Sequence, residues 1–430
     1  MTGDDPAIAR GAANPSSARG ARQRFSRRAL LGGALVGGAA FGVDVALSRL
    51  ARPPRPLGPM SAEAEAVVRR AWEGLDPARV IDAHVHVVGL GVGGTGAWVN
   101  PHMRSWLHPA ERARFEIYLR AAGIDDLDRA DAAYAERLTR LADTTPHGRF
   151  VLLAFDRAHT EDGSVELEAS EFYVPNDYVL SLARANPALF IACASIHPYR
   201  EDAVSELERV AALGARCVKW LPSAMRIDPA SPRCDAFYDK LAALGVPLLS
   251  HGGEERAVDV KEAQALSNPL RLRRALDRGV KVIVAHAASS GQDLDLDARG
   301  ADKPLRPSIE LFFRMLEEPR YERLLFGELS ATTQYNRCHV LPQLLARPEL
   351  ATRFVNGSDY PLPAIHALLR TKKLVELGLI TALERESLNE IDAHNPLLFD
   401  FVVKRTLRGP GGAKLPDSVF MPPEGLYSGG

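Results

Sequence analysis

The sequence predicts an α/β protein built as a (β/α)8 barrel of the TIM type, with a long insertion after its first strand. Three observations predict this fold. Eight short apolar runs alternate with helical patterns, polar residues close several of these runs, and no G-x-G-x-x-G fingerprint of a dinucleotide fold follows any of them. A chain of 430 residues that is 46% hydrophobic is long enough for one such barrel.

The β-rich runs recur with the spacing of βα units and a parallel sheet. The predicted strands are Val80–Val88, Phe150–Phe155, Leu189–Ile196, Arg216–Leu221, Pro247–His251, Lys281–His286, Leu324–Leu329 and Phe354–Ser358. The predicted helices between them include Asp202–Leu213, Asp235–Leu244, Asn268–Arg278, Ser308–Leu316 and Cys338–Leu345. Gly214, Gly245 and Gly279 stand where glycine commonly ends a helix.

The chain divides into a leader, a linker, the barrel and a tail. We expect the linker at residues 51–60, the barrel at 61–407, and a Pro- and Gly-rich tail at 408–430 that wraps the surface or is disordered. Residues 89–149 are far longer than an ordinary connection, which predicts an insertion or lid with two helical patterns.

Residues 1–50 predict a disordered start followed by an export signal. Arg27 and Arg28 precede the uncharged stretch Ala29–Val43, which resembles a twin-arginine signal. The resemblance implies a folded, metal-loaded protein delivered by the twin-arginine machinery to the periplasm or another extracytoplasmic site. The alternative is an ordinary membrane anchor, although the stretch is short for a span. Cleavage and retention as an anchor both stay open.

Charge and cysteine content exclude several classes of protein. There are 53 basic and 54 acidic residues, with no basic excess of the kind that nucleic-acid binding requires. The four cysteines show no C-x-x-C spacing, which argues against a zinc ribbon or a thioredoxin-type site. Cys193 and Cys217 fall in strand-like runs and are expected to be buried free thiols. An oligomer is compatible with the sequence.

The first predicted strand carries an unusual polar set. Asp82, His84 and His86 share one parity, and alternate residues of a barrel strand point inward. We therefore expect the three polar side chains to face the barrel axis. The residues expected to face the helices are Ile81, Ala83, Val85 and Val87.

Four further polar residues close apolar runs. Lys219, His251, His286 and Asp359 lie at or near the ends of the fourth, fifth, sixth and eighth predicted strands. The carboxyl ends of barrel strands meet at one face, where the active sites of this fold lie. We therefore expect these side chains to converge with those of the first strand.

This set resembles the amidohydrolase superfamily, and within it the amidohydrolase-related group that also contains aminocarboxymuconate-semialdehyde-type decarboxylases. The resemblance runs from about Val80 to Val403 and includes "I-D-A-H-N-P-L-L-F" at Ile391–Phe399. It implies one or two divalent ions, Zn²⁺ first, which suit neutral imidazole and carboxylate ligands. The implied metal ligands are His84, His86, Lys219, His251, His286 and Asp359.

The resemblance also assigns catalytic roles. Asp359 would take a proton from the attacking water, and His286 would bind a second metal or hold the developing oxyanion. Lys219 has three interpretations: a CO₂-carboxylated lysine that bridges two metals, a contact for a substrate carboxylate, or a paired structural lysine. The substrate contacts we expect are Arg157, His197, Tyr335 and Arg337, with a packing role equally open for the loop residues among them.

Three functions compete at this point. The leading hypothesis is a metal-dependent hydrolase acting on an amide, ester or lactone carbonyl. The second is a non-oxidative decarboxylase that uses one metal, and the third is a catalytically silent exported metal-binding protein. Lys219 favours the hydrolase, and the complete set of ligands argues against the silent protein. We expect Glu328 and Trp220 only to pack in the core.

Overall fold

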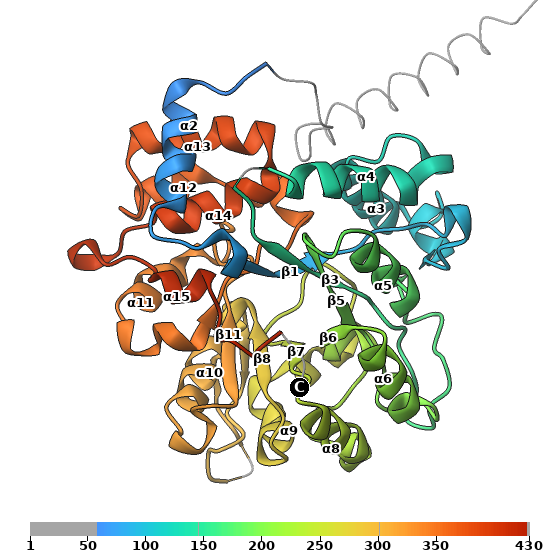
Figure 1. The fold of residues 1–430 in the computed structure, drawn as a ribbon. Coiled ribbons are helices and arrows are strands. Elements are labelled where there is room, and N and C mark those ends of the chain that lie inside the picture. The colour runs from blue at the N-terminus through green and yellow to red at the C-terminus, as the bar shows by residue number, and fades with distance from the viewer. Residues whose placement is uncertain (1–57, 145, 301, 428–430) are drawn as a thin grey trace, which may run out of the picture. The chain divides into compact units, whose positions relative to one another are not determined.

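A computed structural model describes residues 58–427 except 145 and 301. The predicted export signal and most of the linker lie outside these residues. Eight parallel strands form one sheet in the order β1-β3-β5-β6-β7-β8-β11-β12, with helices around it (Figure 1). The strands are β1 (Ile81–His86), β3 (Arg149–Leu153), β5 (Phe190–Ala194), β6 (Ala215–Trp220), β7 (Leu248–His251), β8 (Val282–Ala285), β11 (Leu325–Glu328) and β12 (Phe354–Val355). Each predicted strand is confirmed.

The first and last strands bring the sheet almost to closure. The backbone N–H of Ala83 donates to the carbonyl of Asn356 at 2.8 Å, and that of His86 donates to the carbonyl of Tyr360 at 2.8 Å. Because β1 thus lies beside β12 and the residues after it, the eight strands form the predicted TIM-type barrel.

Helices cover the outside of this barrel (Figure 1). They are α2 (Ala62–Trp72), α3 (Pro109–Ala122), α4 (Ala130–Ala142), α5 (Asn176–Ala185), α6 (Ala203–Ala212), α7 (Pro222–Met225), α8 (Asp235–Leu244), α9 (Arg273–Asp277), α10 (Ser308–Leu316), α11 (Leu341–Leu345), α12 (Thr371–Glu376), α13 (Ala382–His394), α14 (Pro396–Thr406) and α15 (Asp417–Phe420). Gly245, at φ 64°, ends α8 at its predicted end. Within the described part of the chain, every helix is too short or too polar to cross a membrane.

Two antiparallel strand pairs stand apart from the barrel. One joins β2 (Trp98–Val99) to β4 (Phe172–Tyr173), and the other joins β9 (Gln292–Leu294) to β10 (Leu305–Pro307). The segment between β1 and β3 contains β2, α3 and α4. Tyr134 of α4 donates a hydrogen bond to the carbonyl of His86, which ties this segment to the end of β1.

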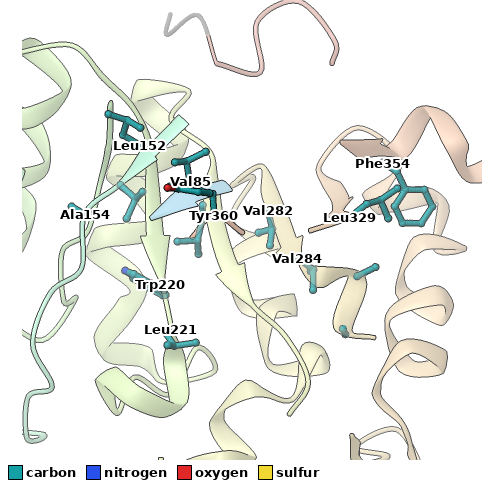
Figure 2. Close-up of a cluster of buried hydrophobic side chains, with 14 of the residues drawn as sticks. Val85, Leu152, Ala154, Trp220, Leu221, Val282, Val284, Leu329, Phe354 and Tyr360 are labelled. Atoms are coloured by element: carbon teal, nitrogen blue, oxygen red, sulfur yellow. The ribbon is translucent and has the colours of Figure 1, made fainter. Parts of the chain in front are cut away.

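Two hydrophobic layers hold the barrel together. The outer layer packs between the sheet and the helices, and Figure 2 shows part of it, including Val85, Leu152 and Val282. Trp220 belongs to this layer and stacks on Phe237 of α8 with ring centroids 5.6 Å apart, which confirms its packing role. The inner layer fills the barrel and includes Val151, Cys193, Cys217, Leu249 and Ile283. Both cysteines are buried free thiols, as predicted.

The first strand does not alternate as simply as predicted. Its register against β3 shifts between Asp82 and Val85. Ile81 and Ala83 pack in the inner layer, whereas Val85 packs in the outer one. The predicted grouping of these apolar residues on one face is therefore wrong, because an irregularity of this kind inserts an extra residue and reverses the parity of the strand.

The same irregularity moves Asp82 away from the barrel axis. Asp82 is paired with Phe150, whose side chain packs against the outer layer. Its carboxylate accepts hydrogen bonds from the backbone N–H of His84 at 3.0 Å and of Ser358 at 2.9 Å. Burial raises the pKa of Asp82 to about 6. Asp82 thus braces the junction of β1 and β12 from behind.

The C-terminal segment, predicted to wrap the surface or to be disordered, contains an ordered helix and buries some of its apolar side chains, while residues such as Gly411 and Glu424 are exposed. Val419 and Phe420 of α15 are fully buried. Leu426 and Tyr427 pack into the inner layer. Val419 and Phe420 therefore add to the outer layer, whereas Leu426 and Tyr427 fill part of the barrel interior.

Candidate active site

A cavity of about 530 Å³ opens at the carboxyl ends of the barrel strands. All six predicted metal ligands line it: His84, His86, Lys219, His251, His286 and Asp359. We call these six residues the polar floor. Strand geometry explains the convergence, because His84, His86, Lys219 and His251 lie in parallel strands, His286 directly follows one, and Asp359 lies in the segment after β12.

The four histidines of the polar floor form a row. The ring centroids of His86 and His84 are 5.0 Å apart, those of His84 and His286 are 5.1 Å apart, and those of His286 and His251 are 5.0 Å apart. The irregularity in β1 leaves both of its histidines at the cavity.

Asp359 lies against one end of this row. Its Oδ1 is 3.1 Å from His86 Nε2 and 3.4 Å from His84 Nε2. Ligand atoms of His84, His286 and Asp359 all lie within 4.8 Å of one another. This compact group includes His286, and His86 lies outside it but contacts Asp359.

Two of these residues hold uncommon backbone conformations. His286 has φ 58° and Asp359 has φ 65°, in the left-handed region that residues other than glycine seldom adopt, although Asp tolerates it better than His does. Such strain is typical of functional sites, where the surrounding structure holds a side chain in position.

Glu328 holds the row from below, a role that the sequence did not reveal. Its Oε2 lies 2.9 Å from His84 Nδ1 and accepts a hydrogen bond from the Ser330 hydroxyl at 2.7 Å. The same hydroxyl lies 2.8 Å from His286 Nδ1. Burial raises the pKa of Glu328 to about 7. When ionised, Glu328 accepts a hydrogen bond from the Nδ1–H group of His84, which leaves Nε2 unprotonated and free as a ligand atom.

His251 has a comparable partner. The buried Glu255 places Oε2 3.3 Å from His251 Nδ1. Burial raises the pKa of Glu255, but the nearby His251 and backbone N–H groups offset this and leave it below the usual value. Two carboxylates thus orient two of the four imidazoles, Glu328 at an inner position of the row and Glu255 at its His251 end.

The residues of the polar floor fit a divalent ion. Nε2 of His84 and Nε2 of His251 are buried and have no hydrogen-bond partner, which is costly unless a ligand occupies them. Burial lowers the pKa of His251 to about 4 and holds those of His84 and His286 well below their usual value. The imidazoles are therefore neutral, the form that binds metal.

Lys219 is buried in the same floor, 2% exposed. Burial lowers its pKa, and the nearby Asp359 and Glu328 carboxyl groups oppose this shift. A larger neutral fraction makes the amine more nucleophilic, as carbamate formation with CO₂ requires.

A second buried network supports the floor from α14. Lys404 donates to the backbone carbonyl of Gly357 and to the carboxylate of Asp400, which also accepts a hydrogen bond from Thr333 at 2.9 Å. A Cβ at Gly357 would lie 2.2 Å from Glu328 Oε1, so only glycine fits there. No sequence motif signalled these contacts.

The predicted substrate contacts separate into two groups. Arg337 lines the cavity, whereas Arg157, His197 and Tyr335 are not among the described residues that line it. His197 is fully buried, with Nε2 2.9 Å from the carbonyl of Met225 and Nδ1 accepting from the backbone N–H of Tyr199.

The other two residues lie against aromatic or cationic partners. The Arg157 guanidinium lies 3.7 Å from the ring centre of Tyr173, and that of Arg370 lies 4.7 Å from the ring centre of Tyr335. Arg157 thus contacts the cavity through Tyr173, which is itself a lining residue.

The family model described as Amidohydrolase matches residues 81–397. The chain belongs to the amidohydrolase family. It is therefore an enzyme, and members of this family bind divalent metal. No curated protein was found that matches the chain.

Several solved structures share the barrel at low similarity. An uncharacterised TIM-barrel protein from Bordetella bronchiseptica is 16% identical, with 71% of this chain and 94% of that chain covered and a TM-score of 0.45. A 5-carboxyvanillate decarboxylase from Sphingomonas paucimobilis is 15% identical, with 69% and 95% covered and a TM-score of 0.42. A Pseudomonas putida protein with the provisional name 2-pyrone-4,6-dicarboxylic acid hydrolase is 17% identical, with 76% and 99% covered and a TM-score of 0.42. Likeness at this level carries no information on substrate or reaction.

Proposed function

We propose that this amidohydrolase is a zinc-dependent hydrolase of amide, ester or lactone carbonyls. The observation that carries the proposal is the row of imidazoles, three of them buried, with Asp359 against it. A divalent ion bound there supplies an activated water and polarises the substrate carbonyl.

The protein's own side chains supply the proton transfers and the orientation. Asp359 Oδ1 takes the proton of the attacking water and passes it to the leaving group. His84, His286 and His251 would hold the ion through neutral nitrogens, and Glu328 and Glu255 orient two of these rings. Burial of the floor excludes bulk water and strengthens these interactions.

The chemical state of Lys219 distinguishes a site with two metals from a site with one. The neutral amine can add CO₂ and lose a proton to give a carbamate, whose oxygens would serve as additional metal ligands. An unmodified Lys219 at the same place would instead hold a substrate carboxylate, as the second candidate, a single-metal decarboxylase, would require.

The proposal is tested on metal-loaded protein by intact mass, metal content and product analysis. We expect hydrolysis of simple esters or lactones, two zinc equivalents, and a gain of one CO₂ that Lys219→Met abolishes. CO₂ release from aromatic or enoic acids, with one equivalent of metal and an unmodified Lys219, would establish the decarboxylase instead.

We also propose that the enzyme is exported through the twin-arginine route. The support is the Arg27-Arg28 pair before an uncharged stretch. Fractionation of cells that express the full chain tests this. Changing both arginines to lysine should retain the protein in the cytoplasm, and unchanged export would contradict the proposal.

A further inference from the structure

The cavity has two chemically different parts. Above the polar floor, most lining side chains are aromatic or aliphatic, and we call this part the apolar walls. The walls are represented by Trp98, Phe115, Phe155, Phe172, Leu362 and Ile365.

The apolar walls come from segments that connect the barrel strands. Strands β2 and β4 pair so that Val99 lies opposite Phe172, and α3 adds Ile117. The turn Leu362–Ala364 after β12 packs against α3, and Leu362 lines the cavity. A hydrogen bond from Tyr118 to the carbonyl of Ala257 ties α3 to the segment that follows β7. The walls are therefore formed by elements that are held in place by strand pairing, packing and a hydrogen bond.

The cations of the walls already have partners. Arg114 pairs with Glu171, and Arg256 Nη2 lies 2.7 Å from Glu254 Oε2. Arg337 donates to the backbone carbonyl of Glu254 at 3.3 Å and lies near the Glu255 carboxylate. A substrate with a second carboxylate would bury that charge against apolar side chains without a free counter-ion among these described residues, which is costly.

We propose that the substrate joins one hydrolysable carbonyl to a bulky, uncharged alkyl or aryl body that fills the apolar walls. The hydrolysable carbonyl of this substrate rests on the hydrolase function proposed above. The bulky, uncharged body is inferred from the walls alone, because the volume of the cavity and the composition of its walls suit a mostly apolar ligand. Small dicarboxylates are excluded as preferred substrates.

Chain length provides the test. Metal-loaded enzyme is assayed by pH-stat on γ-butyrolactone, γ-octalactone and γ-decalactone, and on a lactone of similar size that carries two carboxylates. Burial of each added methylene should raise kcat/KM about fourfold until the walls are filled. A flat series, or preference for the dicarboxylate lactone, would overturn the inference.

A matched pair of variants locates the effect. Ile117→Arg places a charge in the walls, whereas Leu107→Arg makes the same change at a side chain that is 88% exposed. Ile117→Arg should lower kcat/KM for γ-decalactone at least tenfold and change that for γ-butyrolactone less than twofold. Leu107→Arg should leave both values unchanged. The wild-type series decides the question if Ile117→Arg fails to fold.

Calorimetry separates this inference from the hydrolase proposal. Octanoate and glutarate are titrated into metal-loaded and metal-free protein. Tighter binding of octanoate in both forms, without turnover of any lactone, would reject the hydrolase and keep the assigned body. Turnover together with equal or tighter binding of glutarate would keep the hydrolase and reject the body.

Discussion

The polar floor and the apolar walls of one cavity are built in different ways. The floor consists of side chains at the ends of barrel strands, oriented from below by Glu328 and Glu255. The walls consist of side chains from β2, α3, β4 and the turn after β12, which lie outside the barrel sheet. The difference teaches that reaction chemistry is fixed by the sheet, whereas substrate choice is fixed by the segments that connect its strands.

The largest expected effect comes from the floor. Asp359→Asn removes the base but keeps the size of the side chain, and we expect kcat to fall about 10²- to 10⁴-fold. Steady-state kinetics at saturating substrate measures this. Metal content is determined on the same sample, because a loss of metal alone would assign Asp359 to binding instead of proton transfer.

Glu328→Gln tests whether the floor is oriented from below. Loss of the carboxylate that holds His84 Nδ1 should weaken metal affinity about 10- to 100-fold. Competition with a metal-sensing dye measures the change. Unaltered affinity would mean that Glu328 only fills space.

The stability of metal-free protein gives Glu328→Gln a second readout. Burial raises the pKa of Glu328 from 4.5 to about 7, so the folded state keeps a proton that the unfolded chain loses. This group therefore lowers the free energy of unfolding as the pH rises from 4.5 to 7. Gln cannot ionise, so urea titrations of the metal-free variant should show less loss of stability across this range than the wild type.

Gly357→Ala tests how closely the support packs beneath the floor. The new methyl group would lie 2.2 Å from Glu328 Oε1 and 2.8 Å from His84 Cβ. We expect the free energy of unfolding to fall by about 1–3 kcal/mol. Gly378→Ala is not a suitable control, because φ is 71° at Gly378 and alanine would be strained there. Ala62→Gly, at an exposed position, instead measures how much an unrelated exchange between alanine and glycine changes the free energy of unfolding.

The smallest effect is expected in the walls. Phe172→Ala should leave metal content unchanged and lower kcat/KM for an apolar substrate about tenfold, since it removes part of the buried apolar contact. Metal analysis and kinetics on one preparation check both statements. A loss of metal from this variant would break the distinction between walls and floor.

The sequence predicted the barrel and the members of the polar floor because both depend on local patterns. All eight strands were recognisable as apolar runs, and His251 and Asp359 stood where such runs end. The position of a residue at the end of a parallel strand decides where its side chain lies, so linear order was enough to gather the floor.

Other features depend on contacts that linear order does not show. The register shift in β1 is set by its pairing with β3 and by its closure with β12, so the parity of Ile81 and Ala83 was predicted wrongly. Glu328 looked like a packing residue because its partner His84 is 244 residues distant. Tyr427 reaches the barrel interior through a tertiary contact within a Pro- and Gly-rich segment.

The apolar walls were hidden for the same reason. The length of the segment after β1 predicted an insertion or lid, but which of its side chains face the cavity depends on how β2 pairs with β4. His197, predicted from its position after a strand, instead satisfies backbone groups with both ring nitrogens.

The metal content of purified protein tests the central claim most directly. Wild-type protein and His84→Ala are each reconstituted with zinc, dialysed and measured by elemental mass spectrometry. The row of imidazoles with Asp359 against it predicts one or two tightly held equivalents in the wild type and the loss of at least one in the variant. Wild-type protein without bound metal, or a variant with undiminished metal and activity, would contradict the metal-dependent hydrolase.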